Sequence, residues 1–196
     1  MNPKKIEPYL RSQACSLIAG TDEVGRGCLA GPVVAAAVIL PHPPGFDGIT
    51  DSKLLSPQKR DDLYQKILEV ALAWGVGVVS PQIIDEINIF QASLKAMAIA
   101  VEQLSLKPEI LLIDGRHCLP LCLPQKAIIQ GDLHCVSIGA ASIIAKVTRD
   151  RMMKEYEKEF PAFSFGIHKG YPTARHREEL AQKGPCEIHR RSFKLL

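Results

Sequence analysis

The apolar pattern of the chain predicts two strands near its start, followed by strands that alternate with helices. Residues 16–23 (SLIAGTDE) and 32–40 (PVVAAAVIL) are apolar or β-branched runs separated by the glycine-rich turn GRGCLAG, which indicates a hairpin or near-hairpin. Shorter runs of strand type follow at 75–80, 108–115 and 126–132. Early strands in hairpin order, followed by alternating strands and helices, favour an α/β fold with a mixed sheet.

Between these runs, apolar residues recur at the spacing of a helix. Ser56 and Pro57 mark a helix start, because Pro is favoured at the first helical position. An apolar stripe continues from there through Leu63, Ile67, Val70, Ala71 and Trp74. Longer helices are predicted over 81–104 and 137–160, and a shorter one over 172–183.

Length and composition bound the organisation of the chain. Its 196 residues, 46% hydrophobic and 23% charged, suit one globular domain over 1–196, and we expect a small C-terminal helical appendage at roughly 166–196. No apolar run reaches the roughly 20 residues that span a bilayer, and the N-terminus lacks the apolar centre of a signal peptide. We therefore expect a cytoplasmic protein with no membrane contact.

The cysteines and the charges are less informative. The six cysteines form no CxxC pair and are expected to be reduced thiols. A zinc site from His117, Cys118, Cys122, His134 and Cys135 is disfavoured, because two prolines interrupt the segment and tight cysteine pairs are missing. The net charge of +3 is mild. From His168 onward the sequence has seven Lys or Arg and three Glu. Such an excess of positive charge could line a phosphate-facing surface, but charge alone favours the simpler interpretation of a solvated tail.

Acidic residues end three of the predicted strands, and they carry the first chemical signal. Asp22 and Glu23 end the first, Asp114 another and Asp132 the last. A single Asp after a strand is usually a turn residue, whereas several carboxylates at one sheet edge need protons or cations, because like charges raise one another's pKa. Mg²⁺ and Mn²⁺ prefer such oxygen ligands, and two ions about 4 Å apart can clamp a reacting phosphodiester. The pattern points to phosphoryl transfer or hydrolysis.

The neighbouring positions raise two questions of geometry. Adjacent Asp22 and Glu23 should point to opposite faces of a regular strand, so both reach one site only if the backbone bends at the glycines that follow. Arg26 between Gly25 and Gly27 suits a phosphate contact, although a turn with a solvent-facing Arg is an open alternative. The spacing GxGxxxG is one residue too long for a dinucleotide fingerprint, and a strand follows it, which excludes that interpretation.

A set of ordered motifs resembles the ribonuclease HII family, the type 2 ribonucleases H, from about Ala19 to Phe193. The motifs are DEVGRG, DSKLL, IDEINIFQASLKAM, an isolated DG, GD before SIGAASIIAKVTRDRMM, and HKGYPTARH. The resemblance implies a ribonuclease H-like fold, a central mixed β-sheet flanked by helices with a small C-terminal helical part. It also implies an endonuclease that uses Mn²⁺ or Mg²⁺ to cut 5′ of a ribonucleotide, leaving 3′-hydroxyl and 5′-phosphate ends. Its expected substrates are RNA–DNA hybrids and single ribonucleotides embedded in duplex DNA.

The resemblance also implies roles for individual residues. Two metal ions would be held by Asp22, Glu23, Asp114 and Asp132. The 2′-hydroxyl beside the scissile phosphate would be read by the backbone of Gly25, Arg26 and Gly27, which lets a protein distinguish RNA from DNA. Tyr171 would pack on the next sugar, Lys53 and Lys146 would contact phosphate, and Asp150 would pair with a nearby basic group.

The chain departs from the family pattern at two positions, and two rival functions stay open. Cys28 stands where the family has Pro, which could loosen the turn and leave a thiol near the metals, and Gly139 replaces an Ala. The type 3 enzymes carry an extra N-terminal domain, for which the stretch before Asp22 is too short. The alternatives to a type 2 ribonuclease H are another ribonuclease H-like nuclease or recombinase, and a non-enzymatic nucleic-acid-binding module. Nothing in the sequence demands more than a monomer.

Overall fold

The computed structural model describes residues 6–43, 45, 48–49 and 55–195, so Lys53 lies outside the described residues. Its five strands form one mixed sheet in the order β3-β2-β1-β4-β5. The strands are β1 (Ile18–Val24), β2 (Val33–Ile39), β3 (Ala73–Val79), β4 (Ile110–Asp114) and β5 (Gln125–Ile128). Strand β1 pairs antiparallel with β2 and parallel with β4, which confirms the predicted hairpin and mixed sheet.

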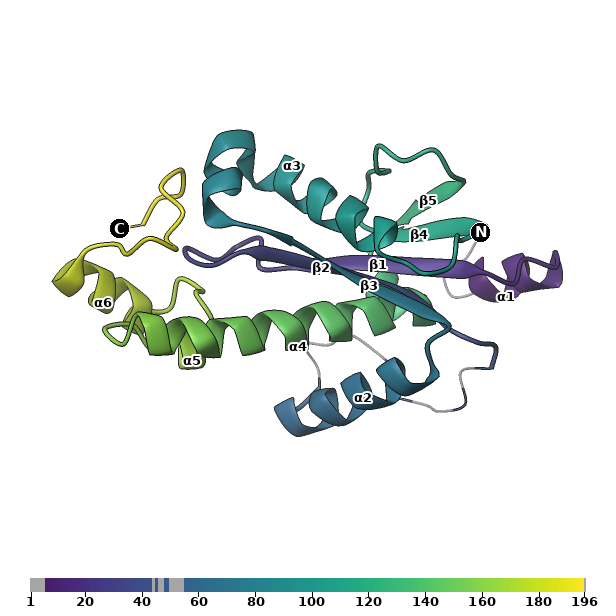
Figure 1. Ribbon diagram of the computed structural model, residues 1–196, viewed down its shortest axis with the longest axis horizontal. Coiled ribbons are helices and arrows are strands. Elements are labelled where there is room, and N and C mark those ends of the chain that lie inside the picture. The colour runs from purple at the N-terminus through teal and green to yellow at the C-terminus, as the bar shows by residue number, and fades with distance from the viewer. Residues whose placement is uncertain (1–5, 44, 46–47, 50–54, 196) are drawn as a thin grey trace.

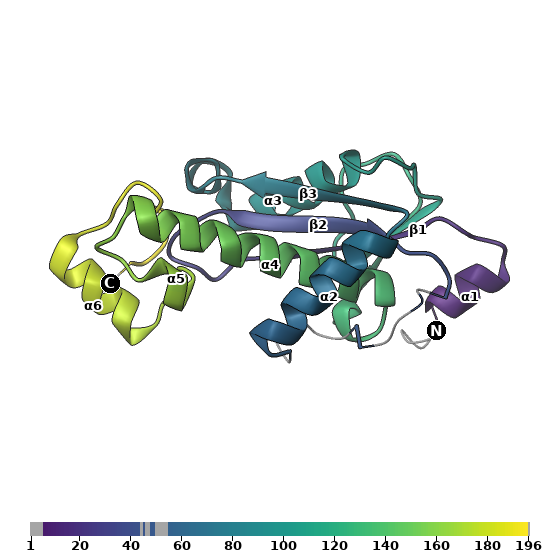
Figure 2. The ribbon, with the colours of Figure 1, turned by 60° about the horizontal axis from the view of Figure 1, so that its bottom comes forward.

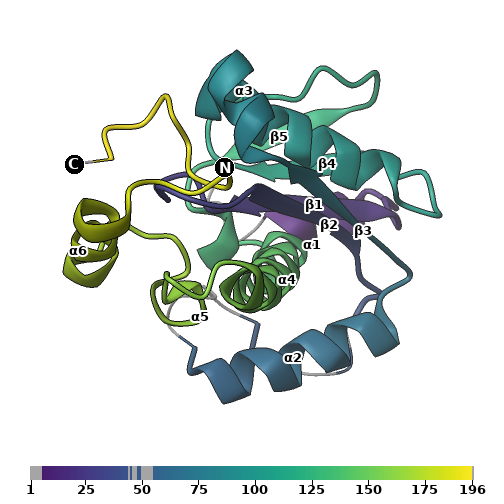
Figure 3. The ribbon, with the colours of Figure 1, turned by 60° about the vertical axis from the view of Figure 1, so that its left-hand side comes forward.

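Helices cover both faces of this sheet. The helices of the described chain are α1 (Ile6–Ser12), α2 (Pro57–Val70), α3 (Pro81–Glu102), α4 (Val136–Glu159), α5 (Phe165–His168) and α6 (Ala174–Lys183). Figure 1 shows α3 on one face and α4 on the other, and the end-on view in Figure 3 places α2 outside α4. The N-terminal α1 lies at one end of the long axis, and α5, α6 and the C-terminus lie at the other (Figure 2).

Small residues let the layers approach closely, and this positions the polar site. Strand β2 is buried along its whole length, with Val33 and Ala35 packed on the α3 side and Ala36 and Val38 on the α4 side. On β1, a Cβ atom added to Gly20 would lie 2.2 Å from the carbonyl carbon of Ser137 in α4. Because α4 rests directly on β1 at this point, its polar side chains reach the acidic end of β1.

Two of the predicted helices need correction. The helix that starts at Pro57, capped as expected by Ser56, ends at Val70, and Trp74 lies on β3, where burial alternates with a period of two. The helix of 81–104 is interrupted at Asn88, whose φ is 66°. The Asn88 side-chain oxygen accepts hydrogen bonds from the N–H groups of Phe90 and Gln91, at 3.0 and 3.1 Å, and so caps a second helical segment.

Tertiary contacts explain α1, which the apolar pattern did not predict. The Glu7 carboxylate of α1 accepts hydrogen bonds from the backbone N–H groups of Val136 and Ser137, each at 3.0 Å. A carboxylate at this point satisfies the unpaired N–H groups that begin α4. The predicted helices over 137–160 and 172–183 are confirmed as α4 and α6.

The C-terminal residues form a separate apolar cluster against the loop between β1 and β2. Phe163, Phe165, Leu180 and Ile188 pack there with residues of that loop. This C-terminal cluster also encloses three histidines.

Over the residues that the structure describes, no helix is both long and apolar enough to cross a membrane.

The three histidines should make folding stability depend on pH. His168, His176 and His189 are buried, and burial lowers the pKa of each, that of His189 to about 4. An unfolded histidine has a pKa of about 6.5, so the unfolded chain binds more protons between these values and stability falls as the pH falls from 6.5 toward 4. His189 alone should cost about 2 kcal/mol between pH 7 and pH 5.

The comparison that isolates this effect is urea unfolding of the protein and its His189→Asn variant at pH 7 and pH 5. The unsubstituted chain should lose about 2 kcal/mol more than the variant over this interval. Equal losses in both proteins would show that the pKa of His189 is not lowered in the folded state.

Candidate active site

Two of the predicted acids meet at the ends of neighbouring parallel strands. Thr21 of β1 lies opposite Ile113 of β4, so Asp22 and Asp114 follow at the same edge of the sheet. Asp22 is only 6% exposed, and its carboxylate accepts a 2.8 Å hydrogen bond from the N–H of Glu23. Burial, followed by the charges of Glu23 and Asp114, raises the pKa of Asp22 well above its usual value, while a hydrogen bond with Ser142 lowers it in part.

Glu23 is the next residue of β1. The strand stays paired with β2 as far as Val24, so no bend separates Asp22 from Glu23, and yet both residues line one cleft. The Glu23 carboxylate forms a 3.1 Å ion pair with Arg26. Burial raises the pKa of Glu23, Arg26 opposes this shift, and Asp114 adds to it. The bend begins only at Gly25, whose φ is 97°.

Asp132 does not lie at the end of a strand, contrary to the sequence prediction. Strand β5 ends at Ile128, Gln130 adopts a left-handed conformation, and Asp132 lies in the short 3-10 helix η2 (Gly131–Leu133). The N–H of Gly131 donates a 2.7 Å hydrogen bond to the Asp114 carboxylate. Asp132 therefore lies in a turn whose preceding residue is bonded to Asp114, and not at the end of the strand itself.

The donor chemistry of these acids suits a divalent cation, although the side chains do not form a finished cage. Among the residues with a described position, no three His, Cys, Asp or Glu side chains are grouped so as to hold a metal ion. Glu23 is instead turned toward Arg26. A hard cation would nevertheless offset the cost of burying the Asp22 charge and its repulsion by neighbouring acids, which together raise the pKa of Asp22. Carboxylate oxygens are the ligands that such a cation prefers.

A cleft opens beside Asp22 and gathers several of the predicted residues. It is lined by Asp22, Glu23, Val24, Arg60, Ser142, Lys146 and Tyr171. Sequence reasoning missed Arg60 on α2 and Ser142 on α4. A signal for Ser142 was available, because it precedes Lys146 and Asp150 by four and eight residues and therefore shares their face of α4.

Lys146 has a fixed place in this cleft. Its ammonium group lies 2.6 Å from the Asp150 carboxylate and 5.9 Å from the centre of the Tyr171 ring. Arg60 approaches the same carboxylate at 3.8 Å. The predicted role of Asp150 as the partner of a basic group is confirmed, and this pairing holds positive charge beside the acids.

Two buried arginines hold the loop that carries Gly25, Arg26 and Gly27. Arg190 donates to the carbonyl of Arg26 at 3.0 Å and to that of Gly31 at 3.0 and 2.9 Å. Arg149 of α4 donates to the carbonyls of Ala30 and Pro32, at 3.1 and 2.9 Å. Arg190 was counted in a basic C-terminal surface, and its complete burial corrects that count.

The same loop leaves part of its backbone open. A Cβ atom added to Gly27 would meet nothing within 4 Å, and the Arg26 side chain is 54% exposed. The backbone carbonyl of Arg26 is nevertheless fixed by Arg190. The loop thus offers accessible backbone on a rigid support, which is the property that close contact with a ligand requires.

Tyr171 lines the same cleft and contacts Cys28. The Cys28 side chain is fully buried and hydrogen-bonds with the Tyr171 hydroxyl. Burial, followed by the effect of Cys28, raises the pKa of Tyr171 to about 12, so the phenol keeps its proton at neutral pH. All six cysteines are free thiols, as predicted.

Known proteins share both the sequence and the fold of this chain. The family model described as Ribonuclease HII matches residues 19–196. A ribonuclease HII of Syntrophus aciditrophicus (strain SB) is 56% identical over 179 residues, which cover 91% of this chain and 84% of that protein. A ribonuclease H2 structure from Pyrococcus horikoshii OT3 is 27% identical, covers 91% of this chain and 94% of its own, and has a TM-score of 0.73.

A more distant structure shares the fold alone. Bst-RNase HIII in complex with Mn²⁺ is 19% identical, with 94% of this chain and 69% of that chain covered and a TM-score of 0.69. The mixed sheet flanked by helices is therefore the ribonuclease H-like fold that the motifs implied. On the family match and the closely related sequences together, the chain belongs to the ribonuclease HII family and is a nuclease, a hydrolase of phosphodiester bonds.

Proposed function

We propose that this nuclease cuts the phosphodiester on the 5′ side of a ribonucleotide and leaves 3′-hydroxyl and 5′-phosphate ends. Its substrates are RNA–DNA hybrids and single ribonucleotides embedded in duplex DNA. The cleft that buried Asp22 lines together with Glu23, Lys146 and Tyr171 is the observation that carries this proposal. It combines acids suited to a cation, a positive charge suited to a phosphate and an aromatic ring suited to a sugar.

The proposed metal is Mg²⁺ or Mn²⁺, held as two ions by Asp22, Glu23, Asp114 and Asp132. Such ions supply Lewis acidity at the phosphate and lower the pKa of a bound water molecule. The chain itself supplies the ligand oxygens and their support. Ser142 hydrogen-bonds to Asp22, and the N–H of Gly131 holds Asp114 at 2.7 Å, so both carboxylates are oriented from outside the ligand set.

Selection for a ribonucleotide is assigned to the loop at Gly25, Arg26 and Gly27 and to Tyr171. The open backbone at Gly27 allows close approach to a 2′-hydroxyl. The protonated phenol of Tyr171 can donate a hydrogen bond near the same sugar, because its pKa is about 12. Lys146 is assigned to phosphate, as is Lys53, and Asp150 holds the Lys146 ammonium in place.

Mapping the cut in end-labelled duplex DNA with one ribonucleotide tests this proposal. Cleavage 5′ of the ribonucleotide is expected with Mg²⁺ or Mn²⁺, and none with EDTA or on the same duplex made only of DNA, because that duplex lacks a 2′-hydroxyl. Equal cutting of the all-DNA duplex would contradict the assigned specificity, and an intact substrate under every cation would contradict the proposed activity. A monomeric state and a cytoplasmic location are also part of the proposal.

A further inference from the structure

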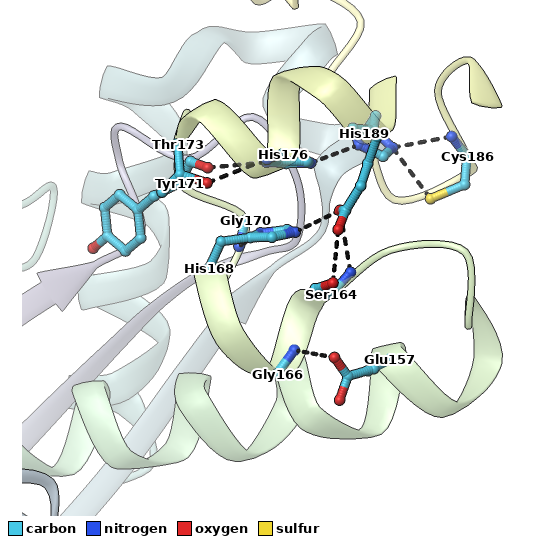
Figure 4. Close-up of polar contacts among 11 residues, drawn as sticks. Glu157, Ser164, Gly166, His168, Gly170, Tyr171, Thr173, His176, Cys186 and His189 are labelled. Carbon is cyan, nitrogen blue, oxygen red and sulfur yellow. Dashed lines mark hydrogen bonds and ion pairs between the residues drawn. The ribbon is translucent and has the colours of Figure 1, made fainter. Parts of the chain in front are cut away.

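A chain of hydrogen bonds runs through the buried C-terminal cluster and ends on the backbone of Tyr171 (Figure 4). The N–H of Cys186 lies 3.0 Å from Nδ1 of His189. Nε2 of His189 lies 3.0 Å from Nε2 of His176. Nδ1 of His176 lies 3.0 Å from the carbonyl oxygen of Tyr171. Two side chains thus connect the C-terminal loop to the residue that forms one wall of the cleft.

The partners at the two ends of this chain fix the proton on each ring. A backbone N–H can only donate, so Nδ1 of His189 accepts from Cys186 and the ring proton of neutral His189 is on Nε2. A carbonyl can only accept, so Nδ1 of His176 carries its proton and Nε2 accepts. His189 therefore donates to His176, and His176 donates to Tyr171. Each bond has one donor and one acceptor only while both rings are neutral.

The third histidine of the cluster, His168, holds the residue just before Tyr171. The N–H of Gly170 donates to Nδ1 of His168 at 3.1 Å, so the His168 proton is on Nε2 and faces the Glu179 carboxylate at 3.0 Å. The rings of His168 and His176 are stacked with their centres 4.1 Å apart. Backbone groups of two successive residues, Gly170 and Tyr171, are thus fixed by two histidines that are packed on each other.

The surroundings keep these rings neutral at pH 7. Burial is the main cause that lowers the pKa of each ring, and only a few charged or titratable groups lie close to the three rings. His189 faces Cys186, Arg191, His176 and His168, His176 faces His168 and Glu179, and His168 faces Glu179, Arg175 and Glu157. The two carboxylates oppose the downward shift but do not reverse its direction at His168.

We propose that His176 is a positioning residue, its tautomer set by His189, that holds the Tyr171 backbone so that the Tyr171 ring faces the acids of the cleft. This inference rests on the proposed contact of Tyr171 with substrate. A purely structural role is the rival explanation, because the same rings pack against Phe163 and Phe165. The two explanations differ in which polar atom of each histidine matters.

Asn and Gln substitutions separate these atoms, because an Asn amide lies near the position of Nδ1 and a Gln amide near that of Nε2. His176→Asn keeps a donor for the Tyr171 carbonyl, whereas His176→Gln loses it. At His189 the order reverses, because Gln keeps a donor for His176 and Asn does not. Both exchanges at one position remove the same ring, so loss of packing alone would not produce opposite orders.

The measurement is kcat/KM on duplex DNA with one ribonucleotide, with urea unfolding of each variant as a check on folding. We expect Asn to exceed Gln at His176 and Gln to exceed Asn at His189, by about 10-fold or more at His176, because small misplacements of binding groups can cost about 100-fold. In a Tyr171→Ala background the difference between His176→Asn and His176→Gln should fall below about 2-fold, since residues that act through one another are not additive.

Each result decides the inference. The same order at both positions, or a His176 difference that persists without the Tyr171 ring, would overturn the positioning role while the unsubstituted protein still cleaves. Should the His176 variants fail to fold, the order at His189 alone decides. An unsubstituted protein that does not cut the ribonucleotide substrate would overturn the proposed function, and the inference with it.

Discussion

Replacing Asp22 with Asn is expected to lower kcat/KM on a ribonucleotide-containing duplex by more than about 100-fold, because changes even to groups behind a metal ligand cost about 10- to 100-fold. Asn is nearly isosteric with Asp and keeps one oxygen to accept from the Glu23 N–H, so the backbone should not move. The charge that a cation would need is lost.

The same variant should fold more stably than the unsubstituted protein when divalent cations are absent. Asp22 is buried beside Glu23 and Asp114, and both raise its pKa, so its ionised form costs folding free energy that the neutral amide does not. A site that gains stability when its acid is removed is a site arranged for a ligand rather than for folding.

Cleavage assays and urea unfolding in EDTA test both parts of this prediction. Asp62→Asn is the matched control, because Asp62 is exposed on α2, where its carboxylate accepts a hydrogen bond from the Gln58 side chain. This variant should change neither quantity appreciably. Cleavage by Asp22→Asn within a few-fold of the unsubstituted rate would remove Asp22 from the proposed metal ligands.

Replacing Arg190 with Met should destabilise the fold by roughly 2–5 kcal/mol, because buried carbonyls that lose their donors cost about 1–3 kcal/mol each. Arg190 is fully buried and its guanidinium donates to the carbonyls of Arg26 and Gly31. Met fills much of the same space but donates nothing. Cleavage should also fall, since the loop at Gly25–Gly27 would lose the support that fixes its backbone.

Arg191→Met provides the comparison for this variant. Arg191 is exposed, and the Asp85 carboxylate contacts its backbone N–H rather than its side chain, so its loss should change stability by less than about 0.5 kcal/mol. Urea unfolding of both variants at pH 7 measures the difference. If the two variants were equally stable, Arg190 would have no special part in holding the loop.

Local pattern was sufficient wherever a feature depends on a few successive residues. Ser56 and Pro57 start α2 because a cap and a first helical proline act within one turn. The run ILLID predicts β4 and puts Asp114 at its end. Asn88 shows where local pattern fell short, because an apolar stripe continues on both sides of it while its backbone leaves the helix.

The sequence by itself determined the order of the five strands and of α2, α3, α4 and α6, the position of Asp114 at the end of its strand, and the family motifs, because each is written in adjacent residues. Only the tertiary structure decided that Arg190 is a buried support and not part of a basic surface, since its partner Gly31 lies 159 residues away. It also decided that Asp132 arrives through a turn and that His176 and His189 hold the Tyr171 backbone. Burial and hydrogen-bond partners arise when distant segments pack, so no local period encodes them.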